Sequence, residues 1–318
     1  MKNTSPLDLA NIKTYSIQER SSKVTPTTFA LPHAAGSSFL EFIDHLPKQL
    51  KAGDLLLLAD LIVEARRQQK PVIVLMGAHV IKVGLNPVLL DAVQNGLITG
   101  LALNGAGSIH DVELAYFGAT SEDVAEGLQN GLFGMARETG VIINETIHRG
   151  AASGKGYGEL LGERILADAP PYQAFSLLAG AVHHHCPITV HVALGTDIVH
   201  QHPNADGAAI GLTSYTDFKI LAGQLCQLQP GSVVLLFGSA VILPEVFLKA
   251  LTVARNLGHP AHGFATAAFD MISHYRPRVN VLQRPTATGG RYFELIGHHE
   301  ILIPLLFAAV KEKLAGAR

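Results

Sequence analysis

The amino-acid sequence predicts an α/β protein with a Rossmann-like, doubly wound parallel sheet in three layers, α/β/α. Two observations support this prediction. Short and continuously apolar runs alternate with longer segments of helical periodicity, a pattern typical of parallel strands that are buried on both faces. Hydrophobic residues make up 48% of the 318 residues and charged residues only 16%, so the chain can bury a large core.

The charge balance and the cysteine content exclude several classes of partner. The formal net charge is -2, which favours neither nucleic acid nor an acidic membrane surface. Two cysteines form no disulfide framework, so we expect a reducing, cytoplasmic location. The first 23 residues lack the apolar centre of a signal peptide, and the apolar run near residue 300 is interrupted by polar residues and a proline. We therefore expect no membrane partner and a small-molecule substrate.

The chain divides into a polar extension, 1–30, and a single domain, 31–318. The first element of that domain is a helix over 53–69, which begins near Asp54 and ends with Arg66 and Arg67, where each charge complements the helix dipole.

A strand over 71–77 comes next, and a second helix follows it. This helix covers 86–96, with Asn86 as the N-cap and Pro87 at its first position. The next pair is the strand 97–105 and the helix 108–118, and a short helix capped by Thr120 or Ser121 comes after it. The remaining predicted strands are 187–194, 231–238, 262–270 and 291–297, and the remaining helices are 158–168, 171–184, 214–228, 243–258 and 299–314.

A glycine-rich segment, 148–160, is the only interruption of this alternation that resembles a boundary. Its flanks continue the same pattern, so we assign one domain. The segment is interpreted either as a flexible lid whose Arg149 and Lys155 contact an anion, or as a surface loop.

The strand that ends at Asn104 runs through Gly105, Ala106 and Gly107 into a helix. Ligands in open parallel sheets bind beyond the carboxyl ends of the strands, and a helix N-terminus offers free N–H groups to an anion. This turn fits a nucleotide pyrophosphate, although it lacks the full G-x-G-x-x-G pattern and a ribose-binding acid. The alternative is a tight turn without a ligand.

Five segments, in order over residues 70–310, resemble the deoxyhypusine synthase family. They are "GAHVIKVGLNPVLLDAVQNGLITGLALNGAGSIHDVELAYFG", "PITVHVALGTD", "SVVLLFGSAV", "TAAFD" and "ILIPLLFAAV". The resemblance implies a Rossmann-like NAD-binding fold, a homotetramer, and a site between subunits for nicotinamide cofactor and polyamine. The cofactor contacts that it implies here are His79, Asn104, Gly105, Ala106, Gly107, Asp197, Gly238, Ser239 and Asp270.

The sequence departs from the family at the residues that carry its chemistry. The family's acidic pair after the small-residue turn falls near His110 and Asp111, and a neutral imidazole attracts a polycation less than a carboxylate does. No lysine lies between Lys249 and Lys311, and the chain has no tryptophan. Arginine cannot form the family's lysine imine. We therefore expect a cofactor pocket that serves different chemistry.

Six histidines and one cysteine lie within residues 183–203. Of these, His200 and His202 are the candidate ligands for a divalent metal, with Asp197 and Asp206 nearby. Their spacing matches no standard zinc signature, so the alternative is ordinary surface or core histidines.

Three functions follow from these observations. The first is an NAD-binding enzyme, a transferase or oxidoreductase, that acts on a small amine or hydroxyl substrate. In this enzyme His110 and Asp111 face the substrate as catalytic residues, and residues 105–107 back the nucleotide. The second is a metal-dependent hydrolase or lyase, and the third is a non-catalytic nucleotide-binding protein. The choice between NAD and NADP, the substrate and the reaction stay open.

Overall fold

The computed structural model describes residues 5–316 and contains one six-stranded sheet in which every strand pair is parallel. The strand order is β3-β2-β1-β4-β5-β6, so the chain leaves β1 toward one edge and returns beside β1 toward the other. A parallel sheet with this order has its topological switch point between β1 and β4. The strands are β1 (Val72–Met76), β2 (Gly100–Asn104), β3 (Ile188–His191), β4 (Val233–Phe237), β5 (Ala265–Asp270) and β6 (Arg291–Ile296).

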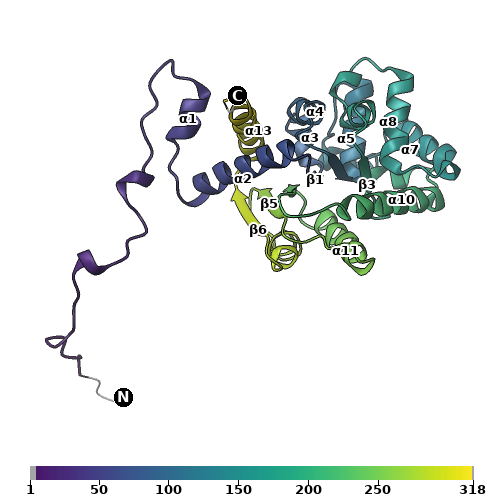
Figure 1. Cartoon of the computed structure of the whole chain (residues 1–318). Helices are drawn as coiled ribbons and strands as arrows, with labels where there is room; N and C mark the ends of the chain where they lie inside the picture. Colours follow the sequence, from purple (N-terminus) through teal and green to yellow (C-terminus); the bar gives the residue numbers. More distant parts are fainter. Residues whose placement is uncertain (1–4, 317–318) are drawn as a thin grey trace.

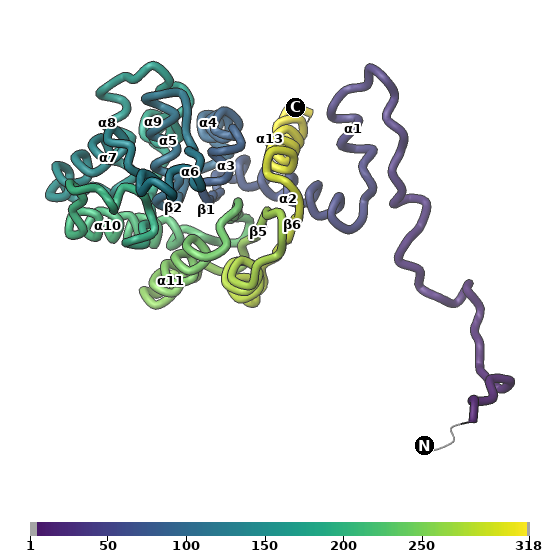
Figure 2. Tube along the Cα trace, turned by 180° about the vertical axis from the view of Figure 1, so that it is seen from behind, coloured from purple at the N-terminus to yellow at the C-terminus, as the bar shows by residue number. Residues whose placement is uncertain are grey.

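Helices cover both faces of the sheet, as Figures 1 and 2 show. One face packs against α2 (Leu50–Arg67), α13 (His299–Ala315) and the group α3 (His79–Lys82), α4 (Asn86–Gln94), α5 (Gly105–Phe117), α7 (Arg137–Gly150), α8 (Tyr157–Asp168) and α9 (Leu177–His183). The other face packs against α10 (Gly207–Leu225), α11 (Ile242–Asn256) and the π-helical segment η6 (Pro277–Gln283). The predicted three-layer α/β/α fold is confirmed.

The strand side chains alternate between these two cores. Val72, Val74 and Met76 of β1 lie in the larger core, whereas Ile73 and Leu75 lie in the smaller one. A strand buried on both faces must be apolar at every position, which is why each central strand reads as a continuous apolar run.

The described part of the N-terminal extension runs away from the body of the molecule as an extended arm (Figure 1). It contains two short 3-10 turns, η1 (Ile17–Glu19) and η2 (Pro26–Thr28), and it ends at α1 (Phe39–His45). The arm exposes large apolar side chains, namely Leu7, Leu9, Ile12, Tyr15, Ile17, Val24, Phe29 and Leu31. No helix in the described residues has the length and apolar character needed to cross a bilayer.

Several predicted helix starts and caps were wrong, including those of α5, α4 and α6. Helix α5 begins at Gly105, because the Asn104 side chain accepts a hydrogen bond from the Gly107 N–H at 3.0 Å and caps the helix there. Asn86 is the first residue of helix α4 and not its N-cap. The N-cap is Leu85, which makes no side-chain hydrogen bond. Helix α6 (Val124–Gln129) is capped by Asp123, because its carboxylate accepts from the N–H groups of the first turn.

The glycine-rich segment 148–160 is mostly helical, which the sequence did not indicate. It contains the end of α7, the 3-10 turn η3 (Ala151–Ser153) and the start of α8. Helix α7 was missed because few of its residues are apolar and its buried face includes Thr139, Gly140 and Asn144. A glycine at position 156 is required by packing, since a Cβ there would lie 1.7 Å from the Asp217 carboxylate.

Candidate functional site

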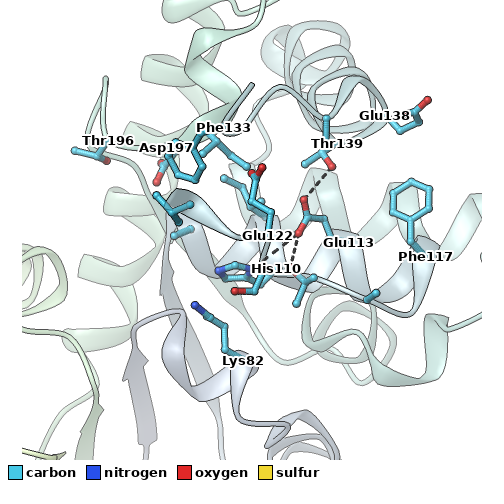
Figure 3. Close-up of a pocket in the computed structure, with 18 residues that line it drawn as sticks. Lys82, His110, Glu113, Phe117, Glu122, Phe133, Glu138, Thr139, Thr196 and Asp197 are labelled. Carbon is cyan, nitrogen blue, oxygen red and sulfur yellow. Dashed lines mark hydrogen bonds and ion pairs between the residues drawn. The ribbon is translucent and has the colours of Figure 1, made fainter. Parts of the chain in front are cut away.

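A cleft of about 930 Å³ opens beside the carboxyl ends of β2 and β3 (Figure 3). Its walls come from the first half of α5, from residues 117–139 and from the loop that follows β3. The cleft has the size of a small-molecule site. The polar side chains that line it are Lys82, His110, Glu113, Thr120, Ser121, Glu122, Glu138, Thr139, Thr196 and Asp197, and the apolar lining includes Ile109, Phe117, Val124, Phe133 and Ile198.

His110 lies at the centre of the polar contacts in this cleft. Its Nδ1 atom is 2.6 Å from the Thr120 hydroxyl oxygen, and that hydroxyl donates in turn to Glu113. The second carboxylate oxygen of Glu113 accepts from the Thr139 hydroxyl at 3.0 Å. Burial lowers the pKa of His110; Glu113 works against this shift, and the nearby Lys82 ammonium adds to it. His110 is therefore neutral near pH 7.

Two other carboxylates at the cleft are held by backbone groups. Glu122 accepts a hydrogen bond from the Gly134 N–H at 2.8 Å. Asp197 caps the short helix η5 (Ile198–Gln201), and burial raises the pKa of its carboxyl to about 6. Lys82 is the one cationic side chain among the described residues that line the cleft.

Asp111, the neighbour of His110, points away from the cleft. Its side chain is completely buried, and it accepts hydrogen bonds from the Asn86 amide, the Ser176 hydroxyl and the N–H groups of Leu177 and Leu178, at 2.6–3.0 Å. Burial raises its pKa to about 6, and these hydrogen bonds oppose the shift. Successive residues of a helix lie about 100° apart, so His110 and Asp111 cannot face the same space. The structure therefore does not bring this pair together.

The three small residues after β2 have different surroundings. Ala106 lines the cleft. A Cβ on Gly105 would lie 1.9 Å from an Asp197 oxygen, so the absence of a side chain lets the loop after β3 approach the helix start. A Cβ on Gly107 would meet Asn104 and Leu103 at 3.2–3.4 Å, so this glycine faces the protein interior. A side chain at position 107 would therefore point into the protein rather than into the cleft.

The remaining predicted cofactor contacts lie at the same edge of the sheet, around the ends of β1, β4 and β5. His79 follows β1, Gly238 and Ser239 follow β4, and Asp270 ends β5. The Ser239 hydroxyl accepts from the Leu243 N–H at 3.3 Å, and Asp270 accepts from the N–H of its neighbour Met271. These strand ends flank the topological switch point of the sheet, where open α/β sheets bind ligands.

One residue at these strand ends, His299, was not singled out in the sequence. The ring of His299 lies 5.6 Å from that of His79, measured between centroids, and its Nε2 donates to the Phe269 carbonyl at 3.0 Å. Its Nδ1 is buried and has no hydrogen-bond partner among the described residues. An unpaired acceptor at this depth is costly, because the buried nitrogen has lost contact with water without gaining a protein partner.

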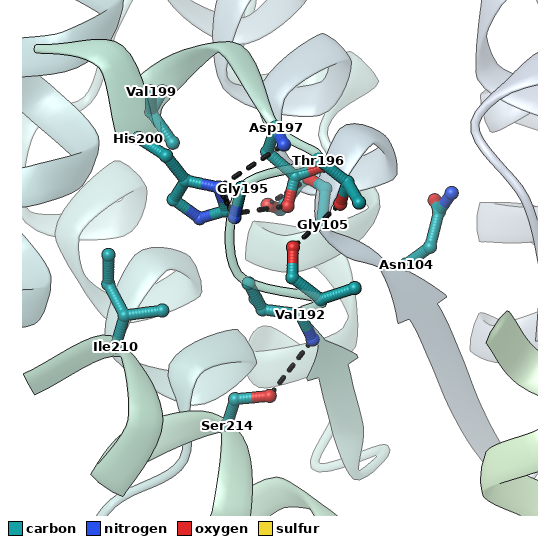
Figure 4. A network of polar contacts seen from close by, with 12 residues as sticks. Asn104, Gly105, Val192, Gly195, Thr196, Asp197, Val199, His200, Ile210 and Ser214 are labelled. Atoms are coloured by element: carbon teal, nitrogen blue, oxygen red, sulfur yellow. Dashed lines mark hydrogen bonds and ion pairs between the residues drawn. The ribbon is translucent and has the colours of Figure 1, made fainter. Parts of the chain in front are cut away.

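One ring nitrogen of each candidate metal ligand, His200 and His202, is hydrogen-bonded to backbone groups. His200 Nδ1 accepts from the N–H groups of Gly195 and Asp197 at 3.1 and 3.2 Å (Figure 4). His202 Nε2 donates to the Gly134 carbonyl at 2.8 Å. In the described part of the chain, no group of three or more His, Cys, Asp or Glu side chains is arranged to hold a metal ion.

Comparison with known proteins identifies solved structures of similar fold. No family model matches the chain, and no curated protein matches its sequence. A conserved protein provisionally named LOR/SDH from Methanococcus maripaludis S2 is 14% identical, with a TM-score of 0.52, over 84% of this chain and 71% of that one. A protein provisionally named deoxyhypusine synthase from Entamoeba histolytica is 10% identical, with a TM-score of 0.52, over 86% and 93%.

A third similar structure is the ternary complex of AgrE with ornithine and NAD+. It is 14% identical, with a TM-score of 0.52, and covers 83% of this chain, which spans only 33% of that protein. At these identities the likeness establishes the fold. The chain has the deoxyhypusine synthase-like fold that the five sequence segments indicated.

The sequence indicated His110 but not the side chains that surround it. Glu113 was detectable in principle, because it lies three residues after His110 on the same helix. Thr120 contacts the His110 imidazole from a loop, and Thr139 contacts the Glu113 carboxylate from α7. No local sequence pattern predicts such contacts.

Proposed function

We propose that the protein is an NAD-dependent enzyme that oxidises a small amine or hydroxyl substrate in the cleft, with His110 as the proton acceptor. The observation that carries this proposal is a neutral imidazole, inside a large cleft, next to the strand ends where this class of sheet binds ligands. A neighbour of the same fold was solved with NAD+ and a small amino acid, which supports the cofactor and the size of the substrate.

In this proposal the dinucleotide binds beyond the carboxyl ends of β1 and β4, at the topological switch point of the sheet. A Cβ on Gly77 would lie 2.1 Å from the Gly238 carbonyl oxygen, so the two strand ends meet without an intervening side chain. The unpaired Nδ1 of His299 is an acceptor for a ribose hydroxyl or a carboxamide N–H. His79, Gly238, Ser239, Asp270 and the helix start at 104–106 would hold the cofactor, which supplies an acceptor for a hydride from the substrate carbon.

In this proposal the residues of the chain bind, orient and move a proton. The apolar wall formed by Phe117, Phe133 and Ile198 holds the substrate and excludes water. His110 removes the proton from the hydroxyl or amine, and Glu113 stabilises the imidazolium that forms. Lysine-imine transfer to a protein acceptor is not part of the proposal, because the chain has no lysine from residue 250 to 310.

Two measurements test the proposal. NAD+ should raise the melting temperature of the purified protein, because a ligand that binds only the folded state stabilises it. His110→Ala should keep this thermal shift and lose roughly 10²- to 10⁴-fold in turnover of the amine or alcohol that the wild type oxidises. If NAD+ does not stabilise the wild type, the proposed cofactor is wrong. If His110→Ala is fully active, His110 is not the proton acceptor.

We also propose a cytoplasmic homo-oligomer, most simply a tetramer. The eight exposed apolar side chains of the N-terminal arm would be covered by a second copy of the chain. The two free cysteines suit a reducing compartment. A monomeric mass in light scattering at micromolar concentration would contradict the oligomer.

A further inference from the structure

We infer that Thr120 and Glu113 fix the tautomer of His110, so that neutral His110 carries its proton on Nδ1 and offers a free Nε2 to the substrate. The inference deepens the proposed function and rests on it only for the catalytic consequence. The tautomer itself follows from the hydrogen bonds among His110, Thr120, Glu113 and Thr139.

The first step counts hydrogen atoms. A threonine hydroxyl has one hydrogen, and a carboxylate can only accept hydrogen bonds. Thr120 gives its hydrogen to one oxygen of Glu113. The hydroxyl oxygen of Thr120 is then an acceptor toward His110, so Nδ1, 2.6 Å away, must be the donor.

The second step concerns the partner that holds Glu113 in place. Thr139, which is 2% exposed, donates to the other oxygen of Glu113 at 3.0 Å. With one hydroxyl on each oxygen, the carboxylate cannot rotate away without losing a hydrogen bond. The order Glu113–Thr120–His110 therefore has one consistent direction of donation.

The third step concerns Nε2, on the side of the His110 ring opposite Thr120. The described residues give His110 Nε2 no hydrogen-bond partner, and Figure 3 shows this side of the ring facing Lys82 and away from Glu113. Burial and the Lys82 ammonium both disfavour the imidazolium. The cleft thus presents an unprotonated acceptor nitrogen next to a cation.

This arrangement selects the kind of substrate group that His110 can bind. An unprotonated Nε2 binds a group with a hydrogen to give, a hydroxyl or an ammonium, rather than a carbonyl oxygen. In the oxidation, the O–H or N–H bond breaks and its proton goes to Nε2. NAD+, when bound, would accept the C–H electron pair as hydride, so that the carbon–oxygen or carbon–nitrogen double bond can form. Thr120 is a positioning residue in this step, since it acts through His110.

The tautomer is measurable without any substrate. The full-length protein with ¹⁵N-labelled histidine rings is studied by long-range ¹H–¹⁵N correlation at pH 8, and His110→Gln identifies the His110 signals among the 16 histidines. We expect a protonated Nδ1 and an unprotonated Nε2 in the wild type and in Thr120→Ser. Thr120→Val, which removes the acceptor, should shift the ring toward the Nε2–H form.

Thr139→Val is the matched control. It removes a hydroxyl from the same carboxylate but does not touch the imidazole, so it should keep the wild-type tautomer. Thermal unfolding of every variant confirms that each is folded at the temperature of measurement. A wild-type His110 that carries its proton on Nε2, or a Thr120→Val ring identical to the wild type, overturns the inference.

Kinetics then separate the inference from the proposed function. Thr120→Val should lower kcat for oxidation roughly tenfold with little change in KM for NAD+, and Thr120→Ser should restore it. If the ring signals behave as expected but His110→Ala keeps full turnover, the proposed function fails and the tautomer stands. If oxidation depends on His110 but Thr120→Val leaves both the ring signals and kcat unchanged, the tautomer inference fails and the proposed function stands.

Discussion

At the scale of single residues, Gly105 and Gly211 differ in whether the structure needs a glycine at that position. Gly105 lies against the Asp197 carboxylate, and a Cβ there would be 1.9 Å from it. Gly211 lies inside α10 with open space around its Cα. The first position needs the absence of a side chain, whereas the second only loses backbone entropy by having none.

Alanine at these two positions should therefore change stability in opposite directions. Gly105→Ala must displace Asp197, and we expect a loss of about 1–3 kcal/mol in the free energy of unfolding. Gly211→Ala should gain about 0.5–1 kcal/mol, the helix-propensity difference. Urea titration measures both, and an equally stable Gly105→Ala protein would mean that the loop after β3 does not pack as described.

We expect the protonation of His110 to set the pH dependence of turnover. A base works when it is unprotonated, and burial places the pKa of His110 below its ordinary value of 6.5. The rate of oxidation should therefore be flat around pH 7 and fall only on the acid side. Lys82→Met removes a nearby cation, so it should raise the pKa of His110 and move the acid limb to higher pH. An unchanged limb would mean that another group controls the profile.

At the scale of elements, Asp111 joins three helices that are far apart in sequence. It belongs to α5, it accepts from Asn86 of α4, and it caps the N-terminus of α9 through Leu177 and Leu178. A buried carboxylate with four hydrogen-bond donors around it has a structural role that its position next to His110 does not suggest.

Removing this carboxylate should cost more than removing an exposed cap. Asp111→Ala leaves several buried donors unpaired, and we expect a loss of about 3–5 kcal/mol. Asp123→Ala, at the exposed N-cap of α6, should lose about 1 kcal/mol. Chemical denaturation compares the two, and similar losses would contradict the role of Asp111 as a junction.

The same contrast explains what the sequence could predict. All six strands and most helices were predicted because an apolar run or a repeat of 3.6 residues is a local property. Of the residues that line the cleft, the sequence pointed to His110, Asp197 and Ala106, which follows β2. Asp111 was expected to face the substrate because it adjoins His110, and its burial depends on Asn86 and Ser176, which are 25 and 65 residues away.

At the scale of the whole molecule, buried acids make stability depend on pH. Asp217 is completely buried between β3 and α8, and burial raises the pKa of its carboxyl from 3.8 to about 7. The folded state then binds the proton more tightly than the unfolded state. The stability that this proton contributes is complete below pH 3.8 and is lost as the pH rises through about 7.

The wild type should therefore lose stability relative to Asp217→Asn between pH 4 and pH 7. The difference in the free energy of unfolding between the two proteins should change over this range by an amount on the order of 3 kcal/mol. Urea titration at several pH values measures this change, and each protein serves as the reference for the other. Parallel curves would show that Asp217 has the same pKa in both states.

The strand order also has a consequence for how the chain is made. Val72 of β1 pairs with Val233 of β4, and 233 − 72 = 161 residues separate them. A nascent chain leaves the ribosome N-terminus first, so β1, β2 and β3 emerge long before β4 can cover the open side of β1. During synthesis that strand presents five apolar residues and an unpaired backbone edge. We expect slow folding with strong chaperone dependence for this reason, and a ribosome stalled before residue 233 should carry the species that a chaperone captures.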